Sequence, residues 1–117
     1  MKRDMNLVRE ILIRVEAQSA DQEGAPLNVG DHSDAEVGYH VKIMHQARLV
    51  EVIGGATDLE SWIPLALTWQ GHDFLDACRE PTRWESAIRL VREKAGAVSF
   101  EVLKQLLVAL SKRSLGL

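Results

Sequence analysis

The feature that most constrains the fold is a pair of β-prone segments, ARLVEVIGG and WIPLALT, joined by the polar stretch TDLES. Residues 49–53 are rich in β-branched side chains, which favour strands. The second segment alternates Ile63, Leu65 and Leu67 with Trp62, Pro64 and Ala66. With Gly54 and Gly55 opening the connection, the two segments predict a β-hairpin. Because Pro64 has no backbone N–H to donate, its strand is expected at an edge or paired on one side only.

Two helices are predicted before the hairpin. Apolar residues at helical spacing favour a helix over residues 4–18, with Asp4 as its cap, and a second over about residues 34–47. Ser33 and Glu36 have the spacing of a capping box at the start of the second helix. One side of that helix carries Val37, His40, Val41, Ile43, Met44 and Ala47, and the other carries Ala35, Gly38, Tyr39, Lys42 and Gln46.

The segment between these helices is rich in turn-forming residues. Residues 19–26 are polar and contain Gly24 and Pro26, so they predict a loop. Residues 27–29 are expected to form a short edge strand.

The stretch LTWQGHDFLDA follows the hairpin and predicts a helix from Thr68 to about residue 79. Thr68 is a suitable N-cap, but Gly71 stands where a capping-box glutamate would be expected. A glycine inside a helix costs roughly 0.5–1 kcal/mol relative to alanine. We therefore expect the absent side chain to permit a close backbone contact that holds the hairpin against a neighbouring helix.

Two further helices complete the chain. Pro81 suits the first turn of a helix that ends at Gly96, and Ser99 is expected to cap a last helix. The chain has 117 residues, of which 46% are hydrophobic, which suits one compact domain with a core. The order of elements predicts a single α+β winged-helix-like domain over residues 1–117. Its β-wing would have two or three strands, and residues 81–117 would form a C-terminal helical extension.

Four segments of the sequence resemble a known family. They are MKRDM, GYHVKIMHQARLVEV, LTWQGHDFLDACR and KRSLGL. They resemble a bacterial and prophage family catalogued as domain of unknown function 2513. The resemblance implies a winged-helix-like fold and implies no activity. LTWQG also resembles the step from wing to helix in bacterial transcription regulators, although residues 19–32 are too loop-like for a complete helix-turn-helix.

A winged-helix arrangement would present the 34–47 helix to a DNA major groove. The candidate DNA-contacting residues are Tyr39, Lys42, His45 and Gln46, with Arg48 just beyond the helix end. Gln46 could read adenine, and Lys42 could bind guanine or phosphate. Acidic residues oppose this hypothesis, since Asp34, Glu36, Asp58 and Glu60 lie at the helix start and the hairpin tip. The alternative is a solvated helix face with mixed charges.

The distribution of charge is uneven. Residues 18–60 contain eight acidic residues and two basic ones, and residues 79–113 contain eight basic and four acidic ones. The basic part suggests a nucleic-acid-binding patch, but interspersed glutamates favour an ordinary exposed helix with local ion pairs.

Tryptophan and leucine residues suggest contacts with another protein. Trp62 is expected to be partly exposed, whereas Trp84 falls on the apolar stripe of its helix. The last helix is apolar over a wide arc that includes Leu106 and Leu110. It could form a homodimer or fold back to close the core.

The remaining candidate residues predict structural roles. His40 is expected to form a hydrogen bond inside the domain, His72 to pack against the hairpin or a helix end, and Cys78 to fill the core. The histidines lack the close spacing of a zinc site, and no catalytic motif is present. We expect no enzyme activity, cofactor, metal, small-molecule substrate or membrane association. The single cysteine and the absence of a secretory signal at the start favour a cytoplasmic protein.

The sequence is compatible with two functions. One is a DNA-associated transcriptional regulator with a winged helix. The alternative is a protein-interaction or dimerisation module that has lost DNA binding.

Overall fold

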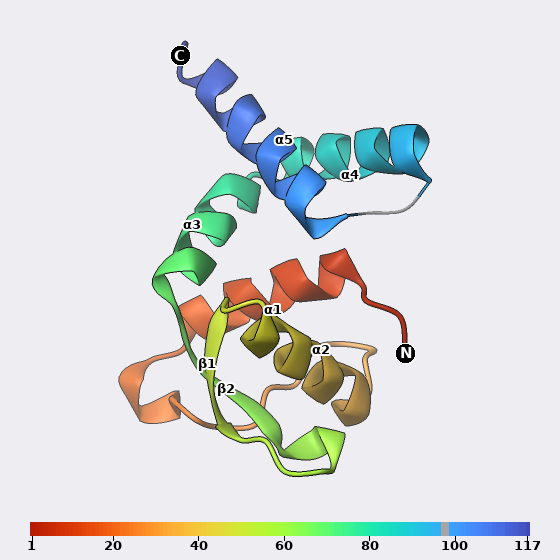
Figure 1. The fold of residues 1–117 in the computed structure, drawn as a ribbon. Helices are drawn as coiled ribbons and strands as arrows, with labels where there is room; N and C mark the ends of the chain where they lie inside the picture. The colour runs from red at the N-terminus through yellow and green to blue at the C-terminus, as the bar shows by residue number, and fades with distance from the viewer. Residues whose placement is uncertain (97–98) are drawn as a thin grey trace. The chain divides into compact units, whose positions relative to one another are not determined.

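The computed structural model describes residues 1–96 and 99–117 (Figure 1). This part of the chain forms five α-helices and one two-stranded antiparallel sheet, which confirms the predicted α+β class. The elements are α1 (Met5–Ala17), η1 (Ala20–Gln22), α2 (Asp34–Gln46), β1 (Val50–Gly54), η2 (Leu59–Ser61), β2 (Trp62–Leu67), α3 (Trp69–Cys78), α4 (Pro81–Ala95) and α5 (Phe100–Ser114).

The chain divides into two compact units. The first comprises Met1–Asp73 and the second Phe74–Leu117, so the division falls inside α3. The second unit contains residues 81–117, which the sequence predicts to be a helical extension, together with the end of α3.

Side-chain caps define the two helices of the first unit before the hairpin. One carboxylate oxygen of Asp4 accepts the backbone N–H groups of Asn6 at 2.9 Å and Leu7 at 3.3 Å. Ser33 and Glu36 form the predicted capping box at the start of α2. These bonds satisfy N–H groups that the first helical turn leaves without a partner.

The predicted hairpin is present. Val50 pairs with Leu67 at its base and Gly54 with Trp62 near its tip, with a bulge between Glu51 and Val52. The hairpin follows α2 along the chain and packs beside it, as the wing of a winged helix does (Figure 1).

The predicted edge strand at residues 27–29 is wrong. These residues form no strand, and the chain turns directly after them at Gly30, which has a φ of 46°. Val29 is only 3% exposed, so its apolar side chain anchors a loop in the core. An apolar segment forms a β-strand only where a second strand lies beside it and pairs with its backbone.

Gly71 lies at a close approach between α3 and the hairpin. A Cβ atom there would overlap the carbonyl group of Leu49 and lie 3.4 Å from Cβ of Leu67. The Thr68 hydroxyl accepts the N–H of Gly71 at 3.0 Å and donates to the carbonyl of Arg48. The cap of α3 therefore also fastens that helix to the start of the hairpin.

In the second unit, α4 and α5 pack against one another. The buried side chains of this unit include Trp84, Ala87, Ile88, Val91, Leu103 and Leu107. The rings of Phe74 and Phe100 stack with centroids 5.0 Å apart. Gly96 ends α4 in the left-handed conformation, as Gly commonly does. Ser99 occupies the N-cap position of α5 but makes no capping bond through its side chain.

Candidate functional site

The face of α2 predicted to read DNA contacts the hairpin of the same chain. Gly38 was expected on the solvent side, but it is buried, and a Cβ atom there would lie 2.6 Å from the carbonyl carbon of Leu59. Lys42 Nζ lies 5.9 Å from the centre of a Trp62 ring, within the range of a cation–π interaction. The hairpin therefore covers part of the face that a DNA groove would need.

The other candidate DNA contacts lie toward the end of α2. His45, Gln46 and Arg48 are exposed, whereas Tyr39 is half-buried. His45 Nδ1 lies 3.3 Å from the Val50 carbonyl, and its ring centroid lies 6.0 Å from that of Trp62. The exposed part of the predicted DNA face is thus reduced to a short segment around the α2–β1 turn.

Acidic side chains lie at both ends of this surface. Asp58 and Glu60 are exposed near the hairpin tip, as Asp34 is at the start of α2. A hydrogen bond from His32, followed by one from the Ser33 backbone, lowers the pKa of Glu36 below its usual 4.5. The Glu36 carboxylate is therefore charged at neutral pH, and its negative charge opposes a DNA phosphate.

His40 connects the two helices of the first unit. Its Nε2 accepts the backbone N–H of Asp4 at 2.8 Å, and its Nδ1 lies 2.8 Å from the Glu36 carbonyl. Because a carbonyl oxygen only accepts, Nδ1 carries the proton and the ring is held as one neutral tautomer. His40 is 2% exposed and joins the cap of α1 to the first turns of α2.

The three tryptophans occupy different environments. Trp84 is 3% exposed and Trp62 is half-buried against α2. Trp69, the first residue of α3, is 81% exposed, and no local pattern in the sequence predicts this exposure. A large aromatic side chain left in water at a helix start is a candidate anchor for a protein partner.

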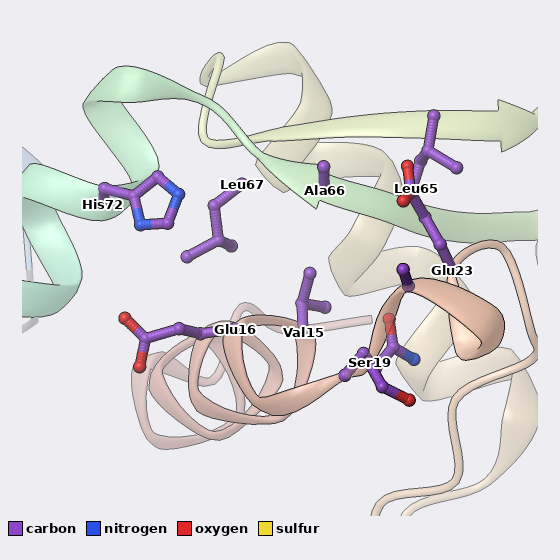
Figure 2. Close-up of a pocket in the computed structure, with 10 residues that line it drawn as sticks. Val15, Glu16, Ser19, Glu23, Leu65, Ala66, Leu67 and His72 are labelled. Carbon is purple, nitrogen blue, oxygen red and sulfur yellow. The ribbon is translucent and has the colours of Figure 1, made fainter.

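The first unit also contains a cavity of about 180 Å³ between the end of α1, η1, β2 and the start of α3. Its lining residues are Val15, Glu16, Gln18, Ser19, Ala20, Glu23, Leu65, Ala66, Leu67 and His72. In Figure 2, His72 and Glu16 lie at one end and Ser19 and Glu23 at the other, with Leu67 between them. His72 is therefore an exposed side chain at the cavity edge, near the end of the hairpin.

The last helix keeps part of its apolar arc in water. Leu103 and Leu107 are buried, and the predicted interface residues Leu106 and Leu110 are half-buried. Val102 and Val108 are 49% and 40% exposed. The α5 helix thus presents apolar side chains beyond those that fill the core.

Three residues of interest were absent from the sequence-based set: Gly38, Trp69 and Gln18. Gly38 carries the same signal as Gly71, an unexplained glycine within a helix. Trp69 and Gln18 have no such signal in the local sequence, because their exposure and environment depend on segments distant in the sequence.

Two further findings concern the described residues as a whole. Within residues 1–96 and 99–117, no three His, Cys, Asp or Glu side chains gather closely enough to hold a metal ion. None of the helices in these ranges combines the length and apolar content needed to cross a bilayer.

These features define a small α+β protein with five described helices and a wing-like hairpin. The chain belongs to the family described as "Hypothetical protein (DUF2513)", whose model matches residues 2–97. An "Uncharacterized protein" of Haemophilus influenzae (strain Rd) is 39% identical over 108 residues. That alignment covers 90% of this chain and 91% of the relative. The comparison with solved structures gives no match.

Proposed function

We propose that this chain is a non-enzymatic protein-interaction module of winged-helix-like architecture. The observation that carries the proposal is the contact between α2 and the hairpin, in which Leu59 lies against Gly38 and Trp62 lies beside Lys42. A helix that reads a DNA groove needs a free face rich in cationic side chains. Here that face is partly covered and is flanked by carboxylates, which disfavours a duplex.

Trp69 supplies an alternative contact point for a protein. The Trp69 side chain is 81% exposed, so a large apolar ring lies in water. It directly follows Thr68, whose hydroxyl donates to the Arg48 carbonyl. Aromatic and arginine side chains are enriched where partner proteins bind most strongly. Such a module would act in the cytoplasm, as the sequence predicts.

A DNA-associated transcriptional regulator is the second candidate. The observation that favours it is the exposure of Gln46 and Arg48 near the end of α2. Gln is suited to adenine and Arg to guanine or phosphate.

Fluorescence anisotropy with labelled duplexes at low salt separates the two candidates. We expect no salt-dependent binding by the wild-type chain, and the same result for Lys42→Ala and Gln46→Ala. A salt-dependent affinity that both substitutions weaken would overturn the proposal in favour of the regulator.

Crosslinking in native cells tests the protein contact directly. We expect a defined partner to be recovered with the wild-type chain and to be lost with Trp69→Ala. Leu115→Ala is the matched control because Leu115 is also exposed, at 75%, but lies in the second unit. If the partner were recovered equally with both variants, Trp69 would not be part of the interface.

A further inference from the structure

We infer that Arg48 and Trp69 form one docking surface for a segment of a partner protein that presents an Asp or Glu side chain beside an apolar one. The partner is the one that the proposed protein-interaction function requires, so the inference rests on that function. Three observations carry it: the unusual backbone of Arg48, the bonds between Arg48 and the start of α3, and the charge of the two segments that meet there.

Arg48 occupies a backbone position that normally belongs to glycine. Its N–H bonds the His45 carbonyl at 3.0 Å, and the next N–H, that of Leu49, bonds the Met44 carbonyl at 2.9 Å. These two bonds form a Schellman motif at the end of α2, in which the residue with positive φ is usually glycine. Among the described residues, Arg48 is the one non-glycine residue with a positive φ, at 63°. Strained positions of this kind cluster at functional sites, so we expect a use for the arginine side chain.

Thr68 joins this position to the start of α3. Its hydroxyl donates to the Arg48 carbonyl, and its backbone N–H bonds the Leu49 carbonyl at 3.0 Å. Trp69 is the next residue and is 81% exposed, and Arg48 is exposed as well. All of these residues lie in the first unit. A guanidinium group and an indole ring are therefore carried by neighbouring backbone positions of one compact unit.

The charge of the two segments favours a carboxylate ligand. Residues 45–50 and 66–72 contain Arg48 and no acidic residue. Within residues 1–96 and 99–117, no carboxylate pairs with the Arg48 guanidinium. A guanidinium group binds a carboxylate through two parallel hydrogen bonds, a geometry that arginine provides and lysine does not. The group that this surface binds therefore carries a negative charge.

The surroundings of this surface favour a protein segment over a nucleic acid. Glu51 and Asp73, both exposed, are the next acidic residues beyond the two segments. They would repel the successive phosphates of a nucleic acid, whereas one carboxylate needs only a single cation. Trp69 adds an apolar ring, and the exposed amides of Gln46 and Gln70 suit a peptide backbone. A peptide with a carboxylate beside an aliphatic side chain matches this combination.

A defined peptide tests this chemistry in an NMR titration. The probe is the capped peptide Gly-Glu-Leu-Leu-Glu-Gly, and its matched control has glutamine in place of both glutamates. We expect the probe to give saturable shifts at Arg48, Gln70 and the Trp69 indole N–H. The control should bind at least about tenfold more weakly, as for loss of a charge-assisted hydrogen bond. Absence of saturable shifts with the probe, or equal affinity for the control, would overturn the inference.

Variants of Arg48 separate a binding role from a structural one. Arg48→Gln and Arg48→Gly both remove the guanidinium, but only glycine relieves the cost of the positive φ. We therefore expect Arg48→Gly to have the higher Tm of the two, while both bind the probe about tenfold more weakly than the wild type. Arg89→Gln is the control, because Arg89 is an exposed arginine of the second unit and should leave the affinity unchanged. If Arg48→Gly bound the probe as the wild type does, the guanidinium would not be part of the surface and the inference would be wrong.

Two further measurements separate this inference from its alternatives. If a thymidine hexanucleotide bound the same residues more tightly than the peptide, the surface would belong to a nucleic-acid ligand and the inference would be overturned. In the crosslinking experiment, a partner that is lost with Trp69→Ala but retained with Arg48→Gln would overturn the inference and leave the proposed function intact. A partner lost with both variants and retained with Arg89→Gln supports both, and recovery that neither variant changes counts against both.

Discussion

At the scale of single residues, Gly38 determines how closely the hairpin approaches α2. An alanine there would bring its Cβ within 2.6 Å of the Leu59 carbonyl carbon, so backbone has to move. The helix itself would gain roughly 0.5–1 kcal/mol from losing a glycine. Overpacking typically costs about 1–3 kcal/mol, and we therefore expect Gly38→Ala to lower the free energy of unfolding by about 1–2 kcal/mol.

Urea denaturation measures this change, and NMR shifts at Leu59 and Glu60 report whether the hairpin tip moves. Gln46→Ala serves as the control, because Gln46 is an exposed residue of the same helix. If Gly38→Ala were as stable as the wild type and left those shifts unchanged, the close contact between hairpin and helix would be wrong.

The two helical glycines also show what the sequence could predict. The caps Asp4, Ser33 and Thr68 act on residues within the next turn, so local spacing was enough to place the helices. Gly71 was predictable as a close contact because it interrupts a capping motif. Gly38 is not predictable as a close contact, because the apolar pattern of α2 indicates only one covered side.

The candidate cavity could not be predicted in the same way. It joins residues 15–23 to residues 65–72, which only the packing of α1 and β2 in the first unit brings together. The exposure of Trp69 likewise has no local signal in the sequence. Local patterns therefore predict the helices and the hairpin but not the loop at residues 27–29, and the surfaces between the elements require the structure.

At the scale of an element, the start of α4 depends on a carboxylate. Glu80 accepts the backbone N–H groups of Arg83 at 2.7 Å and Thr82 at 3.0 Å. The Arg83 bond is the main reason that the pKa of Glu80 falls below its usual 4.5, with the Thr82 bond second. A lowered folded-state pKa gives stability that is fully present above 4.5, the value in the unfolded chain. This stability is lost as the pH falls through the lower value in the folded protein.

Denaturation of wild type and Glu80→Gln at neutral pH and in steps below 4.5 measures this dependence. We expect the wild type to be the more stable at neutral pH and the difference to shrink in acid. Glu85→Gln, an exposed substitution in the same helix, should not reproduce this loss. A difference between wild type and Glu80→Gln that stays constant across the acid range would contradict the capping role.

At the scale of the whole molecule, we propose α5 as a self-association surface. Val102, Leu106 and Ala109 follow one another at spacings of about one helical turn, on the shoulder of the helix beside its buried face. In an antiparallel pair of α5 helices related by a two-fold axis, Glu101 near one helix start would oppose Lys112 near the other helix end. Both apolar contact and charge would then favour the same pairing.

We therefore expect light scattering to give a concentration-dependent dimer that Val102→Ser weakens. Val108→Ser is the matched control, because Val108 is exposed on the opposite shoulder of α5. The sharper test reverses charge: Glu101→Lys should weaken the dimer by placing like charges opposite one another, and adding Lys112→Glu should restore it. A wild-type chain that stays monomeric at every concentration would exclude this pairing. If the double variant did not restore the dimer, the antiparallel register would be excluded. In that register position 101 of one helix faces position 112 of the other, so Lys112→Glu should remove the repulsion that Glu101→Lys creates.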